Sequence, residues 1–122
     1  MYKSFEDMQI WKDSMSLAEE IFGLTDNLPK KEDYGFTSQI RRSVLSISSN
    51  IAEGFGRNYT NDKLNFYYYA RGSLMETLNH IEYAKRVGYL DREISIMLKG
   101  KLKNIHAELN KLTISLRKNS QS

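Results

Sequence analysis

The sequence predicts an all-α protein, an antiparallel up-down-up-down four-helix bundle in which residues 1–122 form a single domain. Apolar residues recur at spacings of three and four along four successive stretches, which is the pattern of helices with one buried face. The chain has a single proline among its 122 residues, so these stretches run on without interruption. Because the connections between them are short, consecutive helices are expected to be antiparallel neighbours.

The first helix is expected over Phe5–Asp26. Ser4, followed by Asp7, resembles a capping box in which aspartate replaces the usual glutamate. Two apolar lines run side by side along this helix, so its apolar face is wider than one two-helix contact needs. The expected buried seam consists of Met8, Trp11, Met15, Ala18 and Phe22, and the line beside it consists of Ile10, Leu17, Ile21, Leu24 and Leu28.

The second helix is expected over Gly35–Gly54, after a break at residues 27–33 that contains Pro29. One apolar line runs along its whole length and is expected to face the core. This line consists of Phe36, Ile40, Val44, Ile47 and Ile51.

The third helix is expected over Thr60–Val87, with Thr60 as its N-cap and Gly88 as its C-terminal cap. The fourth is expected to follow Asp91 as its cap. The core line of the third helix is Tyr67, Leu74, Leu78 and Ile81, and that of the fourth is Ile94, Leu98, Leu102, Ile105, Leu109, Leu112 and Leu116. The spacing in the fourth helix is close to a strict heptad, which is typical of a bundle core.

The composition excludes several classes of protein. With no cysteine, the chain has no disulfide, no thiol nucleophile and no cysteine-bound zinc. No apolar run approaches the roughly 18–20 residues that span a membrane, and Met1 is followed by polar and acidic residues unlike those of a signal peptide. We therefore expect a soluble, cytoplasmic protein without a membrane partner.

Nothing in the sequence indicates catalysis. His80 and His106 both fall away from the centres of their apolar lines and are expected on the surface. No Glu-x-x-His motif of a di-iron bundle occurs, and no glycine-rich phosphate loop follows a strand. We expect no enzyme, no cofactor and no metal.

A polar stripe lies beside the apolar line of the second helix, and its members recur at spacings of four and three. They are Gln39, Ser43, Ser46, Asn50, Glu53 and Arg57. Arg71 lies near the centre of the apolar line of the third helix, where a guanidinium group needs a carboxylate partner. We expect Arg71 to pair with Glu53 or Glu76. A structural polar network between the two helices is favoured over a ligand site.

The aromatic run of residues 66–69 covers all sides of the third helix, so its members cannot all face one core. Exposed aromatic rings can stack on nucleobases or fill a contact between subunits. Because the first helix also has a wide apolar face, the subunit contact is the favoured interpretation.

Charge is spread unevenly along the chain, with a net −4 over residues 1–33 and +5 over residues 99–122. An acidic first helix and a basic last helix can neutralise each other if they lie side by side. The alternative is a basic face on the fourth helix that tracks a phosphate backbone. Its candidate nucleic-acid-binding residues are Lys99, Lys103, Lys111, Arg117 and Lys118, although a solvated lysine face would have the same pattern.

Several runs of the sequence are more specific. They are residues 39–43, 46–54 and 56–57 in the second helix, 70–74 with Glu76 in the third, and 88–90 after it. Together they resemble the four-helix-bundle proteins encoded by intervening sequences of bacterial 23S ribosomal RNA genes. Phe36 departs from this resemblance, because leucine is usual there in the family.

The resemblance implies a bundle that assembles as a homopentameric ring. It also implies kinship with the accessory variability determinant proteins of diversity-generating retroelements, which bind nucleic acid and a reverse transcriptase. It supplies no catalytic residues. The first hypothesis is a non-enzymatic oligomer that binds RNA or DNA through pooled basic side chains, with a reverse transcriptase as a partner if the gene lies in a retroelement. The alternative is a protein–protein scaffold without a nucleic-acid partner.

Overall fold

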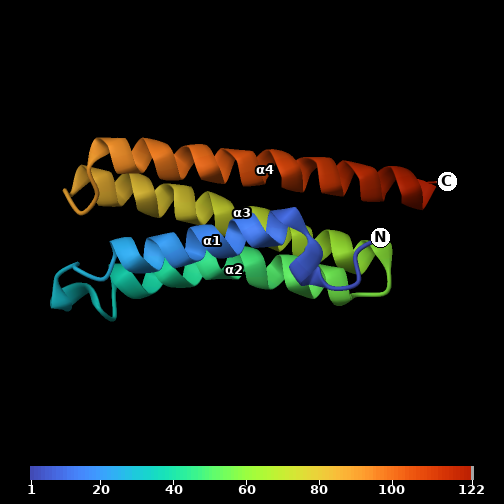
Figure 1. Cartoon of the computed structure of the whole chain (residues 1–122), viewed down its shortest axis with the longest axis horizontal. Helices are drawn as coiled ribbons and strands as arrows, with labels where there is room; N and C mark the ends of the chain where they lie inside the picture. The colour runs from blue at the N-terminus through green and yellow to red at the C-terminus, as the bar shows by residue number, and fades with distance from the viewer. Residues whose placement is uncertain (122) are drawn as a thin grey trace.

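The computed structural model describes residues 1–121, with side chains as far as Asn119, so Ser122 of the predicted domain lies outside the described residues. Four long helices make up most of the fold. They are α1 (Gln9–Leu24), α2 (Phe36–Gly56), α3 (Thr60–Arg86) and α4 (Arg92–Gln121), preceded or joined by the short 3-10 helices η1 (Phe5–Asp7) and η2 (Lys30–Glu32). The chain runs up and down through the four helices, so the predicted antiparallel bundle is confirmed (Figure 1).

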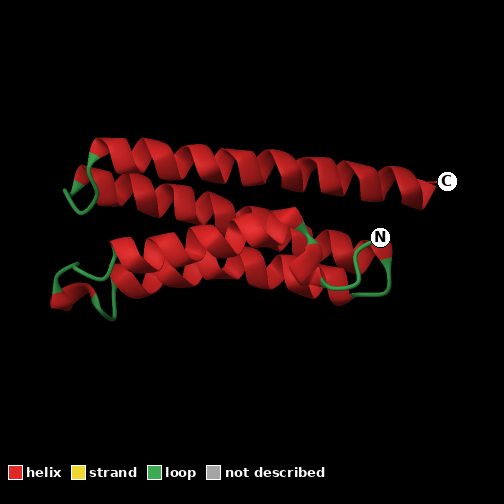
Figure 2. Ribbon diagram, viewed as in Figure 1, coloured by secondary structure: helices red, strands yellow, loops and turns green. Residues whose placement is uncertain are grey.

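The elements join as an all-helical bundle in which each helix packs against the next. No strand occurs among residues 1–121 (Figure 2). The backbones approach closely between α1 and α2, α2 and α3, α3 and α4, and α1 and α4, whereas α2 and α4 lie diagonally across the bundle with their backbones apart. Within the same residues no helix is both long and apolar enough to cross a membrane.

The helix ends follow local sequence signals with small shifts. The predicted capping box of Ser4 and Asp7 is present, but it caps η1, and extended backbone at Met8 delays α1 until Gln9. Helix α3 begins at Thr60, so Tyr59 is its N-cap and contributes no side-chain hydrogen bond. Gly88, with φ of 85°, stands just after α3, where a left-handed conformation ends a helix and glycine adopts it without strain.

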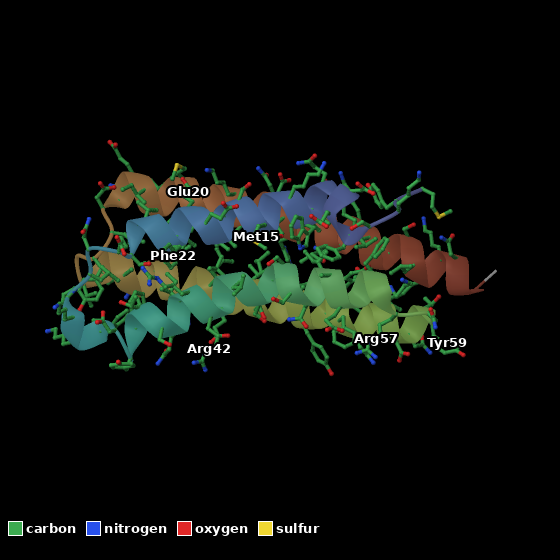
Figure 3. The ribbon with its side chains drawn as sticks, turned by 60° about the horizontal axis from the view of Figure 1, so that its bottom comes forward. Met15, Glu20, Phe22, Arg42, Arg57 and Tyr59 are labelled. Atoms are coloured by element: carbon green, nitrogen blue, oxygen red, sulfur yellow. The ribbon has the colours of Figure 1, made fainter. Side chains whose placement is uncertain are left out.

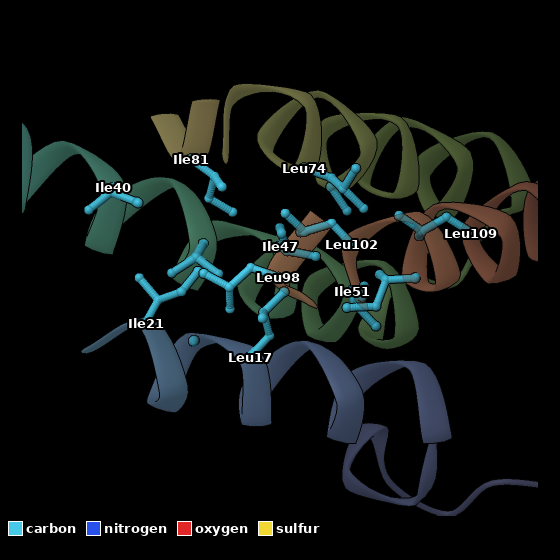
Figure 4. Close-up of a cluster of buried hydrophobic side chains, with 14 of the residues drawn as sticks. Leu17, Ile21, Ile40, Ile47, Ile51, Leu74, Ile81, Leu98, Leu102 and Leu109 are labelled. Carbon is cyan, nitrogen blue, oxygen red and sulfur yellow. The ribbon is translucent and has the colours of Figure 1, made fainter. Parts of the chain in front are cut away.

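The core lies along the axis of the bundle and contains side chains from all four helices (Figure 4). The predicted lines of α2, α3 and α4 supply most of it, and each fully buried leucine or isoleucine contributes about 1.5–3 kcal/mol relative to an exposed one. The fully buried aliphatic side chains include Leu17, Ile21, Ile40, Ile47, Ile51, Leu74, Ile81, Leu98, Leu102 and Leu109.

The predicted seam of α1 is confirmed at Met8 and Ala18, which are buried, but it is wrong at Phe22, which is 57% exposed. Most buried residues of α1 belong instead to the neighbouring line of Ile10, Leu17 and Ile21, which Ser14 continues. Ser14 occupies a core position because its hydroxyl donates to the carbonyl oxygen of Ile10, 2.8 Å away, which satisfies it without water. The serine interrupts the apolar pattern of this line, so the sequence pattern did not identify it as the main buried line, and Met15 and Phe22 of the predicted seam lie at the edge of the bundle.

Candidate nucleic-acid interface

The predicted basic residues of α4 divide between the flank that faces α3 and the solvent side. Lys99 lies on the flank, where its ammonium group pairs with Glu82 of α3. Glu82 also binds Arg86 at 2.7 Å and Lys85 at 3.1 Å. These three cations, with Arg86 first, lower the pKa of Glu82 to about 2. Lys99 is thus held in an intramolecular ion cluster.

The other predicted lysines are more open to solvent. Lys103 and Lys118 are exposed, and Lys111 makes only a 3.4 Å contact with Glu108 on its own helix. Lys101 pairs with Glu20 of α1 at 2.7 Å, so the acidic first helix and the basic last helix do meet, at this ion pair. Most of the positive charge of α4 is therefore not neutralised by α1.

Arg71 does not pair with a carboxylate, so that prediction is wrong. Its guanidinium group donates to the amide oxygen of Asn110 on α4 at 3.0 Å and lies 4.9 Å from the centroid of the Tyr68 ring. Glu53 instead pairs with Arg57 at 3.3 Å, and Glu76 lies 3.5 Å from His80. Because Arg71 is only partly buried, an amide and an aromatic face suffice for its charge.

Arg117 completes this arrangement from α4, because its guanidinium group donates to the hydroxyl of Tyr68 at 2.8 Å. Tyr68, Arg71, Asn110 and Arg117 together form what we call the Tyr68 cluster. Two guanidinium groups from neighbouring helices thus bracket one tyrosine on the α3–α4 face. Guanidinium groups suit phosphate oxygens and an aromatic ring suits base stacking, so the cluster has the chemistry of a nucleic-acid contact.

The other aromatic side chains of residues 66–69 have different surroundings, as their spacing requires. Phe66 lies under the guanidinium group of Arg57, 4.5 Å from it. Tyr67 is buried in the core, where desolvation raises the pKa of its hydroxyl to about 12. Tyr69 is exposed. Sequence reasoning named this run but could not pair Tyr68 with arginines that lie three and 49 residues away along the chain.

The polar stripe of α2 forms the predicted network with α3 only in its middle. Ser43 pairs with Thr77, and Ser46 with Ser73, each pair 2.9 Å apart between hydroxyl oxygens. Asn50 donates to Ser46. The ends of the stripe differ, because Gln39 is exposed and Glu53 pairs with Arg57 in solvent on the same helix. The network therefore orders the α2–α3 contact, and the partners on α3 were not predicted.

His80 is buried, so its predicted surface position is wrong. It is 8% exposed and meets the ring of Phe36 edge-on at 5.8 Å. The reason is that α3 packs against α2 on one flank of its apolar line, and His80 lies on that flank beside Thr77 and Ala84. His106 is partly exposed.

Metal-ligating side chains do not gather in the described part of the chain. No group of three or more histidine, aspartate or glutamate side chains there is arranged to hold a metal ion.

Comparison with known proteins identifies the family. A search of the curated proteins gives no match. A crystal structure of a protein with unknown function from the S23 ribosomal protein family of Bacteroides thetaiotaomicron is similar in fold, with a TM-score of 0.77 at 23% identity. The similarity covers 85% of this chain and 97% of that one. The family described as 23S rRNA-intervening sequence protein matches residues 6–111. The chain therefore belongs to the family of 23S rRNA-intervening sequence proteins.

Proposed function

We propose that this protein is a non-enzymatic, cytoplasmic homo-oligomer, a pentamer by family resemblance, that binds RNA or DNA through basic residues pooled from its subunits. The observation that carries the proposal is the Tyr68 cluster, in which two guanidinium groups bracket an aromatic ring on the α3–α4 face. Exposed lysines of α4 extend the positive charge beyond it. These are Lys103, Lys111 and Lys118.

The chemistry of this face favours contacts with the sugar–phosphate backbone. Lysine and arginine contacts to phosphate carry no sequence information, so binding should be poorly specific and strongly salt-dependent. A single subunit offers few charges and binds weakly. Several subunits that engage one nucleic acid would multiply the affinity through effective concentration. The family description refers to 23S rRNA, so a structured RNA is the first ligand to test.

The test is a salt titration of RNA binding, followed by fluorescence anisotropy. The logarithm of the RNA-binding constant should fall linearly with the logarithm of the salt concentration. Replacing Lys103, Lys111 and Lys118 with glutamine should make this fall less steep, by about 2–3 in the slope for each subunit that contacts the RNA. The matched control replaces Lys12, Lys30 and Lys31 with glutamine. These are exposed residues of α1 and η2, so the control loses the same amount of charge away from the candidate interface. Absence of binding by the wild-type protein at low salt would refute the proposal.

The second candidate is a protein–protein scaffold without a nucleic-acid partner. It is favoured by the ion pairs of Lys99 with Glu82 and of Lys101 with Glu20, which occupy the ammonium groups of two lysines of α4 within the subunit. A reverse transcriptase is the first protein to test if the gene lies in a retroelement. A scaffold would retain its partner when Lys99, Lys103 and Lys111 are replaced with glutamine, whereas the RNA-binding protein would lose affinity for RNA.

A further inference from the structure

A second cluster of aromatic rings and arginine lies at the start of α3, on the flank that faces α2. The guanidinium carbon of Arg57 lies 4.5 Å from the centroid of the Phe66 ring. That ring meets the ring of Tyr69 edge-on, with the two centroids 5.8 Å apart. We call Arg57, Phe66 and Tyr69 the Arg57 cluster. Because Tyr69 is 59% exposed, the cluster presents an aromatic ring to solvent beside a guanidinium group.

The turn between α2 and α3 fixes the backbone on which the Arg57 cluster stands. The ammonium group of Lys63 donates to the carbonyl oxygens of Gly54 and Phe55, at 3.2 Å and 2.8 Å, and so ties the first turn of α3 to the last turn of α2. Arg57 is the C-cap of α2, and exposed Tyr59 follows it at the same end of the bundle (Figure 3). A surface that is ordered before binding loses little conformational entropy when a ligand covers it.

The Arg57 cluster and the Tyr68 cluster lie at the same height on α3. Tyr68 and Tyr69 are consecutive residues, so their Cα atoms differ by about 1.5 Å along the helix axis and by about 100° around it. Tyr68 lies on the flank toward α4, where it meets Arg117. Phe66 lies on the flank toward α2, where it meets Arg57. The two clusters therefore stand on either side of the outward face of α3.

The outward face between the two clusters is open and uncharged. Asn65 lies three residues before Tyr68, and Gly72 lies three residues after Tyr69. Both therefore fall between the two tyrosines around the helix, and both are exposed. A Cβ atom built on Gly72 would meet no atom within 4 Å, so a ligand can come close to the helix backbone there.

Acidic side chains lie above and below this crossing and not within it. Asp62 and Glu76 are exposed and lie seven residues before and after Tyr69, which is about 10 Å along the helix axis in each direction. They would repel the phosphates of a strand that runs along α3. A path across the helix, from one cluster to the other, stays open.

The two clusters differ in charge. The guanidinium group of Arg57 pairs with Glu53 at 3.3 Å in solvent, so the Arg57 cluster supplies stacking surface and little net charge. The Tyr68 cluster contains two guanidinium groups and no carboxylate, and exposed Lys118 follows Arg117 on α4. A ligand that fits this face therefore has anionic groups at one flank of α3 and stackable rings across it, which is the chemistry of a nucleic-acid strand.

We infer that an unpaired segment of RNA crosses the outward face of α3, from the Tyr68 cluster to the Arg57 cluster. Its phosphates lie at Arg71 and Arg117, and its bases stack on the rings of the two clusters. Bases in a duplex are already stacked and paired, whereas unpaired bases can be splayed out onto aromatic rings and guanidinium planes. The inference rests on the nucleic-acid binding in the proposed function, and it names the class of RNA and the path that the RNA takes.

A second protein chain is less well suited to this face. It would remove water from the guanidinium groups of Arg57, Arg71 and Arg117, which is costly unless carboxylates meet them. RNA brings phosphates to the same groups and covers the rings with bases. A subunit contact, which the sequence pattern favoured for these rings, is therefore an outcome that the experiment has to separate.

The experiment measures fluorescence anisotropy with a short unpaired RNA and with the same RNA annealed to its complement. The wild-type protein should bind the unpaired form at least about tenfold more tightly, because only unpaired bases reach the rings. Tyr69→Leu should weaken binding of the unpaired RNA by about 5–100-fold and leave binding of the duplex unchanged. The matched control is Tyr34→Leu, since Tyr34 is fully exposed before α2, at the other end of the bundle.

A second pair of variants tests the path without removing a ring. Gly72→Glu places a carboxylate between the two clusters and should weaken binding of the unpaired RNA at least about tenfold. It should keep the helical content of the wild type in circular dichroism, because a Cβ atom on Gly72 meets no other atom within 4 Å. Asn79→Glu adds the same charge to the same exposed face, about 10 Å further along α3, and should weaken binding by no more than about twofold.

The possible failures are distinguishable. Equal affinity for unpaired and duplex RNA, or unchanged affinity of Tyr69→Leu for unpaired RNA, would overturn this inference and leave the proposed RNA binding standing. No binding of either RNA at low salt would overturn both. Light scattering gives the molar mass of each variant, and a mass of Tyr69→Leu below that of the wild type would assign the ring to a subunit contact and also overturn the inference.

Discussion

The α2–α3 contact includes a glycine that the structure requires, and replacing it should separate two opposing effects. A Cβ atom on Gly54 would lie 2.6 Å from Cε1 of Tyr67 and 3.0 Å from two more atoms of that ring. Tyr67 is only 3% exposed, so its ring cannot swing into solvent to make room. Gly54→Ala therefore forces either the ring or the two helices to move.

The magnitude follows from two terms of opposite sign. Overpacking a core costs about 1–3 kcal/mol, whereas alanine in place of glycine inside a helix gains up to about 1 kcal/mol. We expect a net loss of about 1–2 kcal/mol in the free energy of unfolding. The displaced ring is enclosed, so the cost of overpacking should lie in the upper half of its range. For a chain of this size each kcal/mol lowers Tm by about 3–5 °C.

The assay is thermal and urea unfolding followed by far-ultraviolet circular dichroism at one protein concentration. The control is Gly72→Ala, since Gly72 lies inside α3 and a Cβ atom there would meet no atom within 4 Å. That variant should be stabilised by about 0.5–1 kcal/mol through the helix term alone. If Gly54→Ala is as stable as Gly72→Ala, the close approach of Tyr67 does not constrain α2.

Three further predictions test the ion cluster, the core and the candidate interface. The pKa of Glu82 is lowered from its ordinary value of 4.5 to about 2. The stability that the ionised carboxylate contributes is therefore fully present above pH 4.5 and is lost as pH falls toward 2. Tm of Glu82→Gln should therefore fall less over that range than Tm of the wild type, and high salt should reduce the difference. Leu102→Ala should cost about 2–5 kcal/mol in urea unfolding, because Leu102 is fully buried; a smaller loss would place it outside the core. Tyr68→Leu should weaken binding to an unstructured RNA by about 5–100-fold with Tm nearly unchanged, and equal affinity would remove Tyr68 from the interface.

The candidate interface was only half predictable. The sequence named Lys103, Lys111, Lys118 and Arg117, because lysines and arginines recur along one side of a helix and that recurrence is local. It missed Tyr68 as their partner. The bond between Tyr68 and Arg117 depends on how far α3 and α4 are shifted against each other, and the spacing within either helix contains no information about that shift.

The wrong predictions for Arg71 and His80 have the same cause, namely that the sequence of one helix does not show which helices lie beside it. Both predictions came from the angular position of a side chain on its own helix. Arg71 meets Asn110 because α4 lies on that flank of α3, and His80 is buried because α2 covers the opposite flank. A helical wheel gives the angle of a residue, and only the neighbouring helices decide whether that angle faces water, a core or a partner.

The amino-acid sequence by itself determined the four helices, their antiparallel order, the buried lines of α2, α3 and α4 and the family of the chain. These depend on periodicity, caps and loop lengths, which are properties of neighbouring residues. Only the tertiary structure decided which residues of the two apolar lines of α1 enter the core. Both lines are apolar enough, and the choice depends on the rotation of α1 against α2 and α4. That rotation buries Ile10, Ser14, Leu17, Ala18 and Ile21 and leaves Phe22 in an open groove.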